Sequence, residues 1–345
     1  MVSRRKKQML LSFLRDTNRK KWVQIINELT ILWYSKNEFP SYYIVNLLYR
    51  KNVTNYKDYL SSSENTKLLN WSYSKAPDQI IQVENKLLFE NYLVKNNIPT
   101  PKIFAHNTKN NFTYNGNNFK IGTKEDLFIF LENIFCEQGV EQIFCKPVTG
   151  IMGENIFIIS KSTYKNIADN LIALVLSKAF IFQELIVQHN ALKKINRSSL
   201  NTLRVVTYKS NEVEVLCGFL RVGRAGSIID NAHAGGIIIP FHKETGKLYA
   251  EGLQLIDNGG GVYYKHPDTG TVFDNYQIPH YKEVIDLVTK GASLFKFPFS
   301  GWDVAITNKG PIIIEANHDF HLKLSDRMEK GLKRTPSIKE LIDNL

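Results

Sequence analysis

The chain has 345 residues and a net charge of +11, and this length is sufficient for two or three subdomains with a sizeable core. Its 43% of hydrophobic and 22% of charged residues exclude a disordered tail or a fibrous repeat. No apolar run reaches the roughly 20 residues that cross a bilayer. The three cysteines, Cys136, Cys145 and Cys217, form no CxxC motif. They favour a reducing compartment over a disulfide framework or a zinc site, so we expect a cytoplasmic protein.

Positive charge is concentrated in the first 60 residues. They hold twelve Lys and Arg against four Asp and Glu, a balance of +8, whereas the other 285 residues hold only +3. A solvated helix face would explain this balance. A peripheral contact with the inner membrane face, a phosphorylated carrier or an acidic polysaccharide is the alternative. We find no nucleic-acid recognition motif and expect no nucleic-acid partner.

Hydrophobic spacing predicts helices first and strands later. Residues 1–80 have helical spacing, and a further helix over 82–96 ends before Pro99 and Pro101. From about residue 100 short apolar runs alternate with helical stretches. Beyond residue 200 strands dominate, interrupted by a helix over 281–295. This order predicts an α+β protein with a helical, basic amino-terminal region.

The segment 301–317, GWDVAITNKGPIIIEAN, predicts an antiparallel hairpin around Asn308. With a three-residue loop Asp303 would face Glu315, and Asn317 would share the face of Glu315. A register shifted by one residue would send the carboxylates to opposite faces. Opposed carboxylates repel, which would raise at least one pKa, and Mg²⁺ would relieve the conflict. Two exposed charges at a strand end are the alternative.

A lysine lies beside a glycine-rich turn in residues 143–159, IFCKPVTGIMGENIFII. Lys146 ends a strand, and a loop with Gly150 and Gly153 follows. A lysine supplies a positive charge for polyphosphate, and glycines let backbone N–H groups close over it. The loop leads into a strand and lacks GK[ST], so it is not a Walker A motif. An ordinary hairpin with an exposed lysine is the alternative.

Three further segments have weaker signals. Lys86, early in a predicted helix, would by itself be a surface residue. The strand 179–187, AFIFQELIV, and the connector after it could offer backbone groups to an adenine edge, but a buried strand is the alternative. The loop 225–236 could line a substrate pocket or be a plain loop; its polar and glycine candidates are Asp230, Asn231, His233, Gly235 and Gly236.

Together these motifs resemble the ATP-grasp superfamily, and more closely its sugar-transfer-associated branch. The resemblance covers roughly residues 80–320 and rests on the order of Asn85-Lys86, Ile98-Pro99-Thr100-Pro101, Cys145-Lys146-Pro147, Gln183-Glu184-Leu185-Ile186, Asn201-Thr202-Leu203-Arg204, Gly301-Trp302-Asp303 and Glu315-Ala316-Asn317. It implies two α+β subdomains that clamp ATP. Residues 81–190 would form the small lid subdomain with its preceding helix, and 191–345 the large subdomain with the metal site. Residues 1–80 depart from the usual amino-terminal domain.

The resemblance also implies residue roles. The implied ATP contacts are Lys86, Lys146, Thr149, Gly150, Gly153, Gln183, Glu184, Leu185 and Ile186. Asp303, Glu315 and Asn317 would hold Mg²⁺. Arg204 and Arg221 would act in catalysis by neutralising charge on the transferred phosphoryl group. Many members hold the ribose with an acid where this chain has Gln188 and His189, so the ribose contact stays open.

The reaction that the resemblance implies is carboxylate activation by ATP and Mg²⁺. An acyl phosphate would form and an amine would convert it to an amide, in the modification of a sugar or surface polysaccharide. The partners would be a small-molecule or saccharide carboxylate and an amine donor. A phosphotransferase with the same ATP site, or a non-catalytic ATP- or carbohydrate-binding module, are the alternatives. Because Lys146 would contact phosphate, we expect Lys146→Ala to leave the fold intact.

Overall fold

The computed structural model describes residues 4–150, 154–224, 226–227, 230, 235–255, 258, 260–318, 320 and 322–345. The chain forms two compact units. The large unit consists of Met1–Gln79, Gln188–Pro311 and Ala316–Leu345, and the small unit consists of Ile80–Val187 and Ile312–Glu315. The α+β class expected from the sequence is confirmed, because both units combine helices with an antiparallel sheet.

The small unit is built on a six-stranded sheet with the order β3-β2-β1-β6-β4-β5. Its strands are β1 (Ile103–Thr108), β2 (Asn111–Tyr114), β3 (Asn117–Lys120), β4 (Gln142–Pro147), β5 (Phe157–Ser160) and β6 (Ala179–Glu184). Its helices are α6 (Lys86–Lys95), α7 (Lys124–Gln138) and α8 (Asp169–Ser177), and α5 (Pro77–Glu84) leads into it. The hydrophobic core includes Phe130, Leu131 and Ile134 of α7 and the alternate strand residues Cys145 and Phe182.

The helix expected over 82–96 is in fact two helices. The chain breaks at Asn85, where α5 has ended and α6 begins. Asn85 is in an extended conformation, and its side-chain oxygen accepts a hydrogen bond of 3.0 Å from the backbone N–H of Leu88. This is an N-cap, so the local hydrogen bond starts a new helix inside an apparently continuous pattern.

The large unit is built on a seven-stranded sheet with the order β11-β10-β9-β8-β7-β12-β13, although Ile312–Glu315 within β13 are counted with the small unit. These strands are β7 (Thr202–Lys209), β8 (Val213–Val222), β9 (Ile237–Pro240), β10 (Gly252–Gln254), β11 (Gly261–Tyr263), β12 (Phe299–Thr307) and β13 (Gly310–Asn317). Its longer helices are α1 (Arg4–Arg15), α2 (Trp22–Lys36), α4 (Ser62–Lys75), α10 (Tyr281–Ser293) and α12 (Pro336–Asp343). The shorter ones are α3 (Tyr42–Val45), α9 (Asn190–Ile195) and α11 (Leu322–Met328), and 3₁₀ turns cover Tyr56–Asp58 and Leu332–Arg334.

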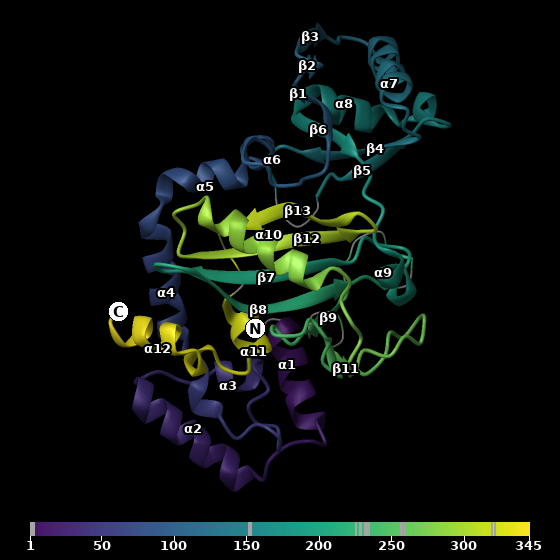
Figure 1. Cartoon of the computed structure of the whole chain (residues 1–345). Coiled ribbons are helices and arrows are strands. Elements are labelled where there is room, and N and C mark those ends of the chain that lie inside the picture. The colour runs from purple at the N-terminus through teal and green to yellow at the C-terminus, as the bar shows by residue number, and fades with distance from the viewer. Residues whose placement is uncertain are drawn as a thin grey trace. The chain divides into compact units, whose positions relative to one another are not determined.

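Helices cover both faces of the large sheet. Helix α10 lies across β7, β8 and β12 on one face (Figure 1). On the other face Val206, Tyr208 and Phe299 pack with residues of α4, α11 and α12. Arg204 lies on this second face as well, because it alternates with Val206 and Tyr208 along β7. The apolar part of this face therefore continues directly into a polar part.

The amino-terminal helices have a hydrophobic core of their own. Phe13 of α1, Ile25 and Leu32 of α2 and Tyr43 of α3 are members of one buried cluster. The predicted helical amino-terminal region is thus confirmed. Among the helices in the described ranges, none combines the length and apolarity that crossing a membrane requires.

Candidate functional site

In the small unit, Lys146 is held by a buried carboxylate. Register pairs Lys146 of β4 with Ile181 of β6 and Phe144 with Gln183, so Lys146 and Gln183 share one face of the sheet. That face is opposite to the one on which Cys145 packs into the core. The Lys146 Nζ forms an ion pair with Glu90 Oε1 of α6, and the Glu90 side chain is fully buried. Burial raises the pKa of Glu90, although the charge of Lys146 opposes this.

Lys86 lies beside the glycine-rich turn. Its Nζ donates a hydrogen bond of 2.7 Å to the Gly150 carbonyl, and its backbone N–H donates to the Val148 carbonyl at 2.9 Å. The same Nζ lies 3.6 Å from Glu315 Oε1. From its own position in the sequence, Lys86 would be a surface residue. In the structure its side chain is only 13% exposed. Lys86 and Lys146 therefore each have a carboxylate partner.

The strand expected over 179–187 is shorter than predicted, so the connector begins inside that segment. Strand β6 ends at Glu184, and Leu185 and Ile186 continue as an irregular, half-buried connector. Glu184 Oε1 accepts a hydrogen bond of 2.7 Å from the Lys102 backbone N–H, which fixes the end of the strand. Gln183 is buried, and its Oε1 has no hydrogen-bond partner within the described ranges.

In the large unit, two arginines converge on Asp303. Antiparallel register places Asp303 of β12 directly opposite Arg204 of β7, and Thr202 opposite Arg221 of β8. Arg204 donates from Nε at 2.5 Å and from Nη2 at 3.0 Å, and Arg221 Nη2 lies 2.9 Å from Asp303 Oδ2. Burial raises the pKa of Asp303, but the two guanidinium groups outweigh it and hold the pKa below its usual range. The carboxylate repulsion expected in the hairpin therefore does not raise the pKa of Asp303.

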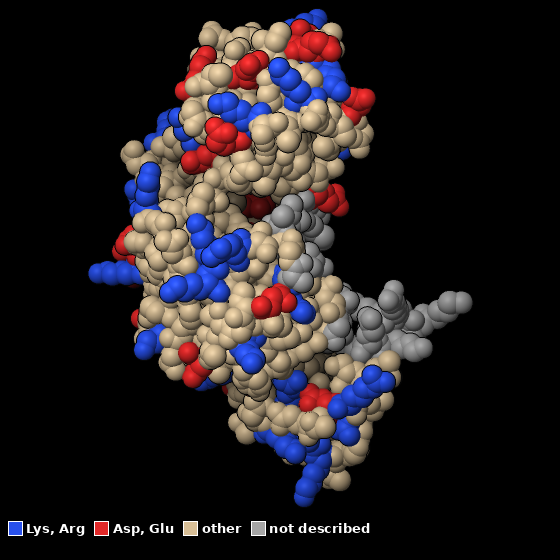
Figure 2. Space-filling view, turned by 90° about the vertical axis from the view of Figure 1, so that its right-hand side faces the viewer, with Lys and Arg blue, Asp and Glu red and all other residues tan. Residues whose placement is uncertain are grey.

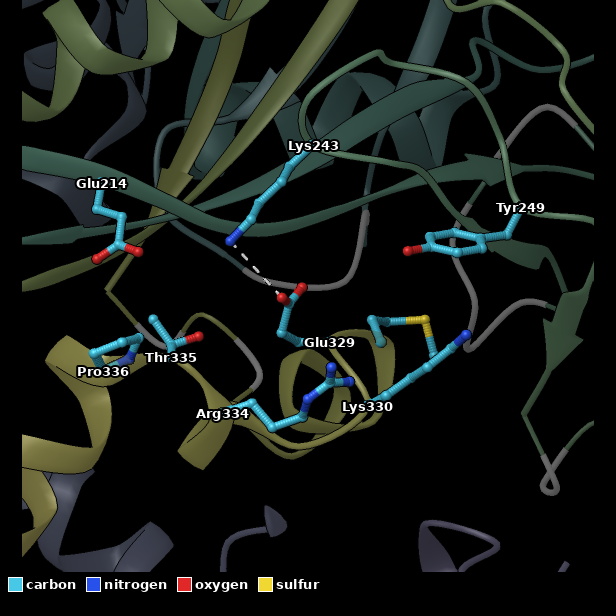
Figure 3. A pocket seen from close by; sticks show the side chains of 9 residues that line it. Glu214, Lys243, Tyr249, Glu329, Lys330, Arg334, Thr335 and Pro336 are labelled. Carbon is cyan, nitrogen blue, oxygen red and sulfur yellow. Dashed lines mark ion pairs between the residues drawn. The ribbon is translucent and has the colours of Figure 1, made fainter. Parts of the chain in front are cut away.

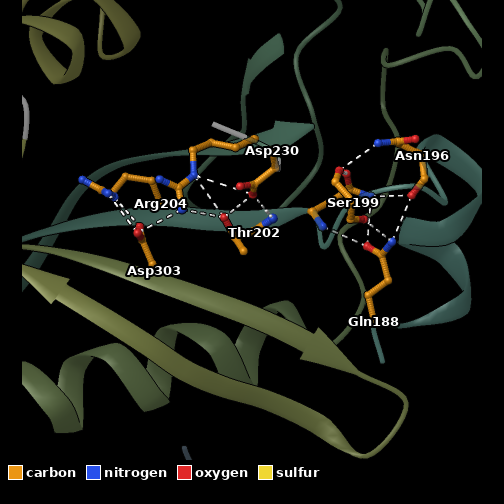
Figure 4. A network of polar contacts seen from close by, with 9 residues as sticks. Gln188, Asn196, Ser199, Thr202, Arg204, Asp230 and Asp303 are labelled. Atoms are coloured by element: carbon orange, nitrogen blue, oxygen red, sulfur yellow. Dashed lines mark hydrogen bonds and ion pairs between the residues drawn. The ribbon is translucent and has the colours of Figure 1, made fainter. Parts of the chain in front are cut away.

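A second carboxylate, Asp230, completes this network (Figure 4). Its Oδ2 accepts from the Thr202 backbone N–H at 2.9 Å and from Thr202 Oγ1 at 2.5 Å, and lies 3.8 Å from Arg221 Nε. Burial raises the pKa of Asp230, although Arg221 opposes this. Two cations and two carboxylates thus lie on one sheet face, which we call the arginine cluster: Thr202, Arg204, Arg221, Asp230 and Asp303.

One guanidinium nitrogen of the cluster is left unsatisfied. Arg204 is buried, and its Nη1 has no hydrogen-bond partner among the residues that the structure describes. A Cβ at position 301 would lie 3.2 Å from this Nη1 and equally close to Phe320, so Gly301 lets the guanidinium pack closely against the backbone of β12. A buried donor without a partner is costly, and an anionic group placed there would satisfy it.

The comparison with known families decides the family. A family model described as sugar-transfer associated ATP-grasp matches residues 65–339. The chain belongs to this ATP-grasp family. The resemblance inferred from the order of the motifs is therefore confirmed, and with it the ATP-grasp fold. No curated protein matches the chain.

Several solved structures are similar to this ATP-grasp chain. N5-carboxyaminoimidazole synthase from Aspergillus clavatus, in complex with ADP, has a TM-score of 0.41 and 10% identity, and the match covers 70% of this chain and 46% of that one. The ATP-grasp ligase PsnB with a minimal precursor, Mg and ADP has a TM-score of 0.38 and 15% identity, and the match covers 75% of this chain and 62% of that one. D-alanyl-alanine synthetase A from Vibrio cholerae has a TM-score of 0.41 and 13% identity, and the match covers 74% of this chain and 66% of that one. The chain spans about half to two thirds of the length of these proteins.

The other expected site residues of the ATP-grasp chain fall into two groups. Thr149 and Gly150 are exposed at the end of β4, and the Gly235 carbonyl accepts a hydrogen bond of 2.8 Å from Gln254. Gly236 follows it and immediately precedes β9. The remaining candidates lie outside the described residues; they are Gly153, Asn231 and His233.

The donor chemistry of the expected magnesium set fits the metal. Asp303 and Glu315 supply carboxylate oxygens and Asn317 an amide oxygen, which are ligands that Mg²⁺ prefers. The amide nitrogen of Asn317 is buried and has no partner in the described part of the chain. Within the described ranges no group of three or more His, Cys, Asp or Glu could hold a metal.

Sequence reasoning missed Glu90 and Thr202. Glu90 stands one helical turn after Lys86 in α6, and this i,i+4 spacing was the available signal. Thr202 alternates with Arg204 on β7, so both residues lie on one face. Neither spacing shows that Glu90 would meet Lys146, which lies 56 positions away.

A separate pocket of about 360 Å³ in the large unit was also missed (Figure 3). It is lined by Glu214, Lys243, Tyr249, Met328, Glu329, Lys330, Arg334, Thr335 and Pro336. Lys243 and Glu329 form an ion pair at 3.8 Å, and Lys330 lies over the Tyr249 ring at 4.8 Å. It shares no lining residue with the arginine cluster.

Proposed function

We propose that the chain is an ATP- and Mg²⁺-dependent carboxylate–amine ligase that forms an amide through an acyl phosphate. The single observation that carries this proposal is the unsatisfied Nη1 of buried Arg204 in the arginine cluster. A phosphoryl group in transfer spreads negative charge over its oxygens, and fixed donors stabilise that charge without reorganisation. Arg221, which shares Asp303 with Arg204, would supply the second guanidinium.

Lys86 and Lys146 of the small unit are suited to bind the phosphates of ATP. Lys86 is already hydrogen-bonded to Gly150 at the glycine-rich turn. Lys146 is oriented by Glu90, and a lysine whose position is fixed loses less freedom on binding phosphate. The connector at Leu185 and Ile186 would offer its backbone groups to the adenine edge.

Asp303, Glu315 and Asn317 would hold Mg²⁺. The ion would neutralise part of the phosphate charge of ATP. Asp303 also serves the two arginines, so its negative charge would balance cations in the absence of nucleotide.

The chain needs no nucleophilic side chain for this chemistry. The substrate carboxylate attacks the γ-phosphorus of ATP, a new C–O–P linkage forms, and ADP leaves. The amine nitrogen then attacks the acyl carbon, the C–O bond breaks, and inorganic phosphate leaves with one carboxylate oxygen. The amine proton goes to solvent or phosphate. Positioning and charge neutralisation supply the catalysis.

The sugar-transfer association of the family favours a saccharide carboxylate as substrate. A uronic acid, which joins a sugar ring to a carboxylate, fits this class. An amino acid would be a suitable amine donor. The product would then be a sugar acid amide, as in a modified surface polysaccharide.

The products distinguish the ligase from its alternatives. The full chain is incubated with Mg-ATP, a panel of hexuronic acids and a panel of amino acids, and the products are separated by mass. ADP, free phosphate and an amide in equal amounts support the ligase. ADP with a stable phosphorylated sugar would contradict it and identify a kinase. ATP binding with unchanged ATP across the panels would contradict it in favour of a binding module.

A further inference from the structure

Helix α2 has one face that is fully used in folding. Ile25, Glu28 and Leu32 are buried, and they follow one another at spacings of three and four residues. Ile25 and Leu32 belong to the core of the amino-terminal helices. Glu28 accepts hydrogen bonds from Lys20 Nζ at 2.6 Å and Tyr43 OH at 2.5 Å. The inner face therefore needs no further partner.

The opposite face of α2 is apolar and exposed. We call it the α2 outer face, and it consists of Trp22, Val23, Ile26, Thr30, Trp33 and Tyr34. Exposure reaches 71% for Val23, 55% for Trp33 and 86% for Tyr34. At 100° per residue these six side chains occupy one continuous arc of the helix. None of them is charged.

The charges of α2 are turned away from this arc. Its charged residues are Glu28, which is buried, and Lys36, which pairs with Glu64 at 2.6 Å. Phe39, 63% exposed, extends the apolar surface and meets the Trp33 ring edge-on at 6.0 Å. Leu10 and Leu14, one turn apart on α1, are also about half exposed.

The amino-terminal region that contains the α2 outer face is basic in composition. Residues 1–60 carry a balance of +8 out of the +11 of the whole chain. Figure 2 shows Lys and Arg gathered at its lower end, where α1–α3 lie in Figure 1. An uncharged apolar helix face inside a basic region is complementary to a surface with an apolar interior and anionic head groups.

The α2 outer face lies outside the part of the chain that matches the family model. The family model begins at residue 65, so α1, α2 and α3 all precede the matched part. Because these helices have a closed core of their own, selection for folding does not explain exposed Trp33 and Tyr34. Exposed apolar patches of this kind are typical of interaction surfaces.

We propose that the α2 outer face docks on the surface of a bilayer that contains anionic lipids. Tryptophan and tyrosine favour the level of the head groups, where the ring is apolar and the polar tip stays hydrated. Val23 and Ile26 add apolar area just below that level. The basic residues around the helix attract the anionic head groups and hold the helix in the membrane plane.

The full chain is tested by co-sedimentation with two kinds of vesicle, one of pure phosphatidylcholine and one with 30% phosphatidylglycerol. We expect binding to the anionic vesicles, at least tenfold weaker binding to the neutral ones, and loss of binding at 1 M salt, where electrostatic attraction is screened. The variant V23S/I26S/W33S should bind the anionic vesicles at least tenfold more weakly. I129S, at a 62% exposed isoleucine of α7 in the small unit, is the matched control and should bind like the parent.

Tryptophan emission provides a second readout. Trp33 is exposed while Trp302 is fully buried, so a blue shift on adding anionic vesicles reports mainly on the outer face. Unchanged thermal melting of V23S/I26S/W33S would show that the variant folds. Equal vesicle binding by the parent and this variant would overturn the proposal. A parent dimer that the variant abolishes, without vesicle binding, would overturn it in favour of a second copy of the chain.

Discussion

Lys146, which we propose to bind phosphate, also has a structural role through its ion pair with Glu90. The sequence indicates a lysine for phosphate beside a glycine-rich turn, and this part of the interpretation needs only local information. It does not indicate that the lysine is 3% exposed and faces a fully buried carboxylate. We therefore no longer expect Lys146→Ala to leave the stability of the fold unchanged.

We predict that Lys146→Ala lowers the free energy of unfolding by about 3 kcal/mol, because it leaves the buried carboxyl of Glu90 without its partner. Urea unfolding measures this loss. The double variant K146A/E90Q removes the unpaired charge and should recover part of the stability. It should not recover ATP affinity, because the phosphate-binding cation is still missing. Identical unfolding curves for the parent and Lys146→Ala would contradict the buried pair.

At the scale of elements, the strands of the 301–317 hairpin were predictable and their neighbours were not. Alternating apolar runs and turn residues indicate β12 and β13 directly. The partner of Asp303, however, depends on β7 lying next to β12, and Arg204 is 99 positions away in the sequence. Likewise, the apolar pattern over 82–96 hides the cap at Asn85, because a capping side chain does not interrupt hydrophobic spacing.

Asp303 and Glu315, the two acids of the hairpin, should differ in how much their substitution destabilises the fold, because only Asp303 belongs to the arginine cluster. Asp303→Asn weakens the partner of two buried guanidinium groups, so it should lower the free energy of unfolding by roughly 1–3 kcal/mol. Glu315 is about one third exposed and lies 3.6 Å from Lys86, so Glu315→Gln should cost less than about 1 kcal/mol. Both variants should lose Mg²⁺-dependent ATP turnover.

Thermal melting with and without Mg-ATP measures both effects. The parent should gain stability on binding, and both variants should gain much less. If the Glu315→Gln variant turned over ATP at the parental rate, the assignment of Glu315 as a Mg²⁺ ligand would be contradicted. Asp303→Asn that melts like the parent without nucleotide would contradict the structural role of the arginine cluster.

For the whole molecule, Asp326 connects distant parts of the large unit. Its Oδ2 accepts from the Leu60 N–H at 3.0 Å and its Oδ1 from the Leu332 N–H at 2.8 Å. Burial raises its pKa to about 7 from an ordinary value of 3.8, although these two hydrogen bonds favour the charged form. Between about pH 4 and pH 7 the folded chain then holds a proton that the unfolded chain has lost.

The free energy of unfolding should therefore fall as the pH rises through this range, by at most about 4 kcal/mol from this one group. Asp326→Asn has no carboxyl to titrate at this position, so its stability should not show this contribution. The difference in unfolding free energy between the parent and Asp326→Asn, measured at several pH values, isolates it. Parallel pH profiles of the two proteins would contradict the raised pKa.

The central claim is that a substrate carboxylate takes the γ-phosphoryl group of ATP and then yields its acyl group to an amine. Labelling both carboxylate oxygens of an accepted hexuronic acid with ¹⁸O tests it most directly. We expect one labelled oxygen in each inorganic phosphate and the other in the amide product. Unlabelled phosphate, formed together with ADP, would show that water and not the carboxylate attacked ATP, and would contradict the acyl phosphate route.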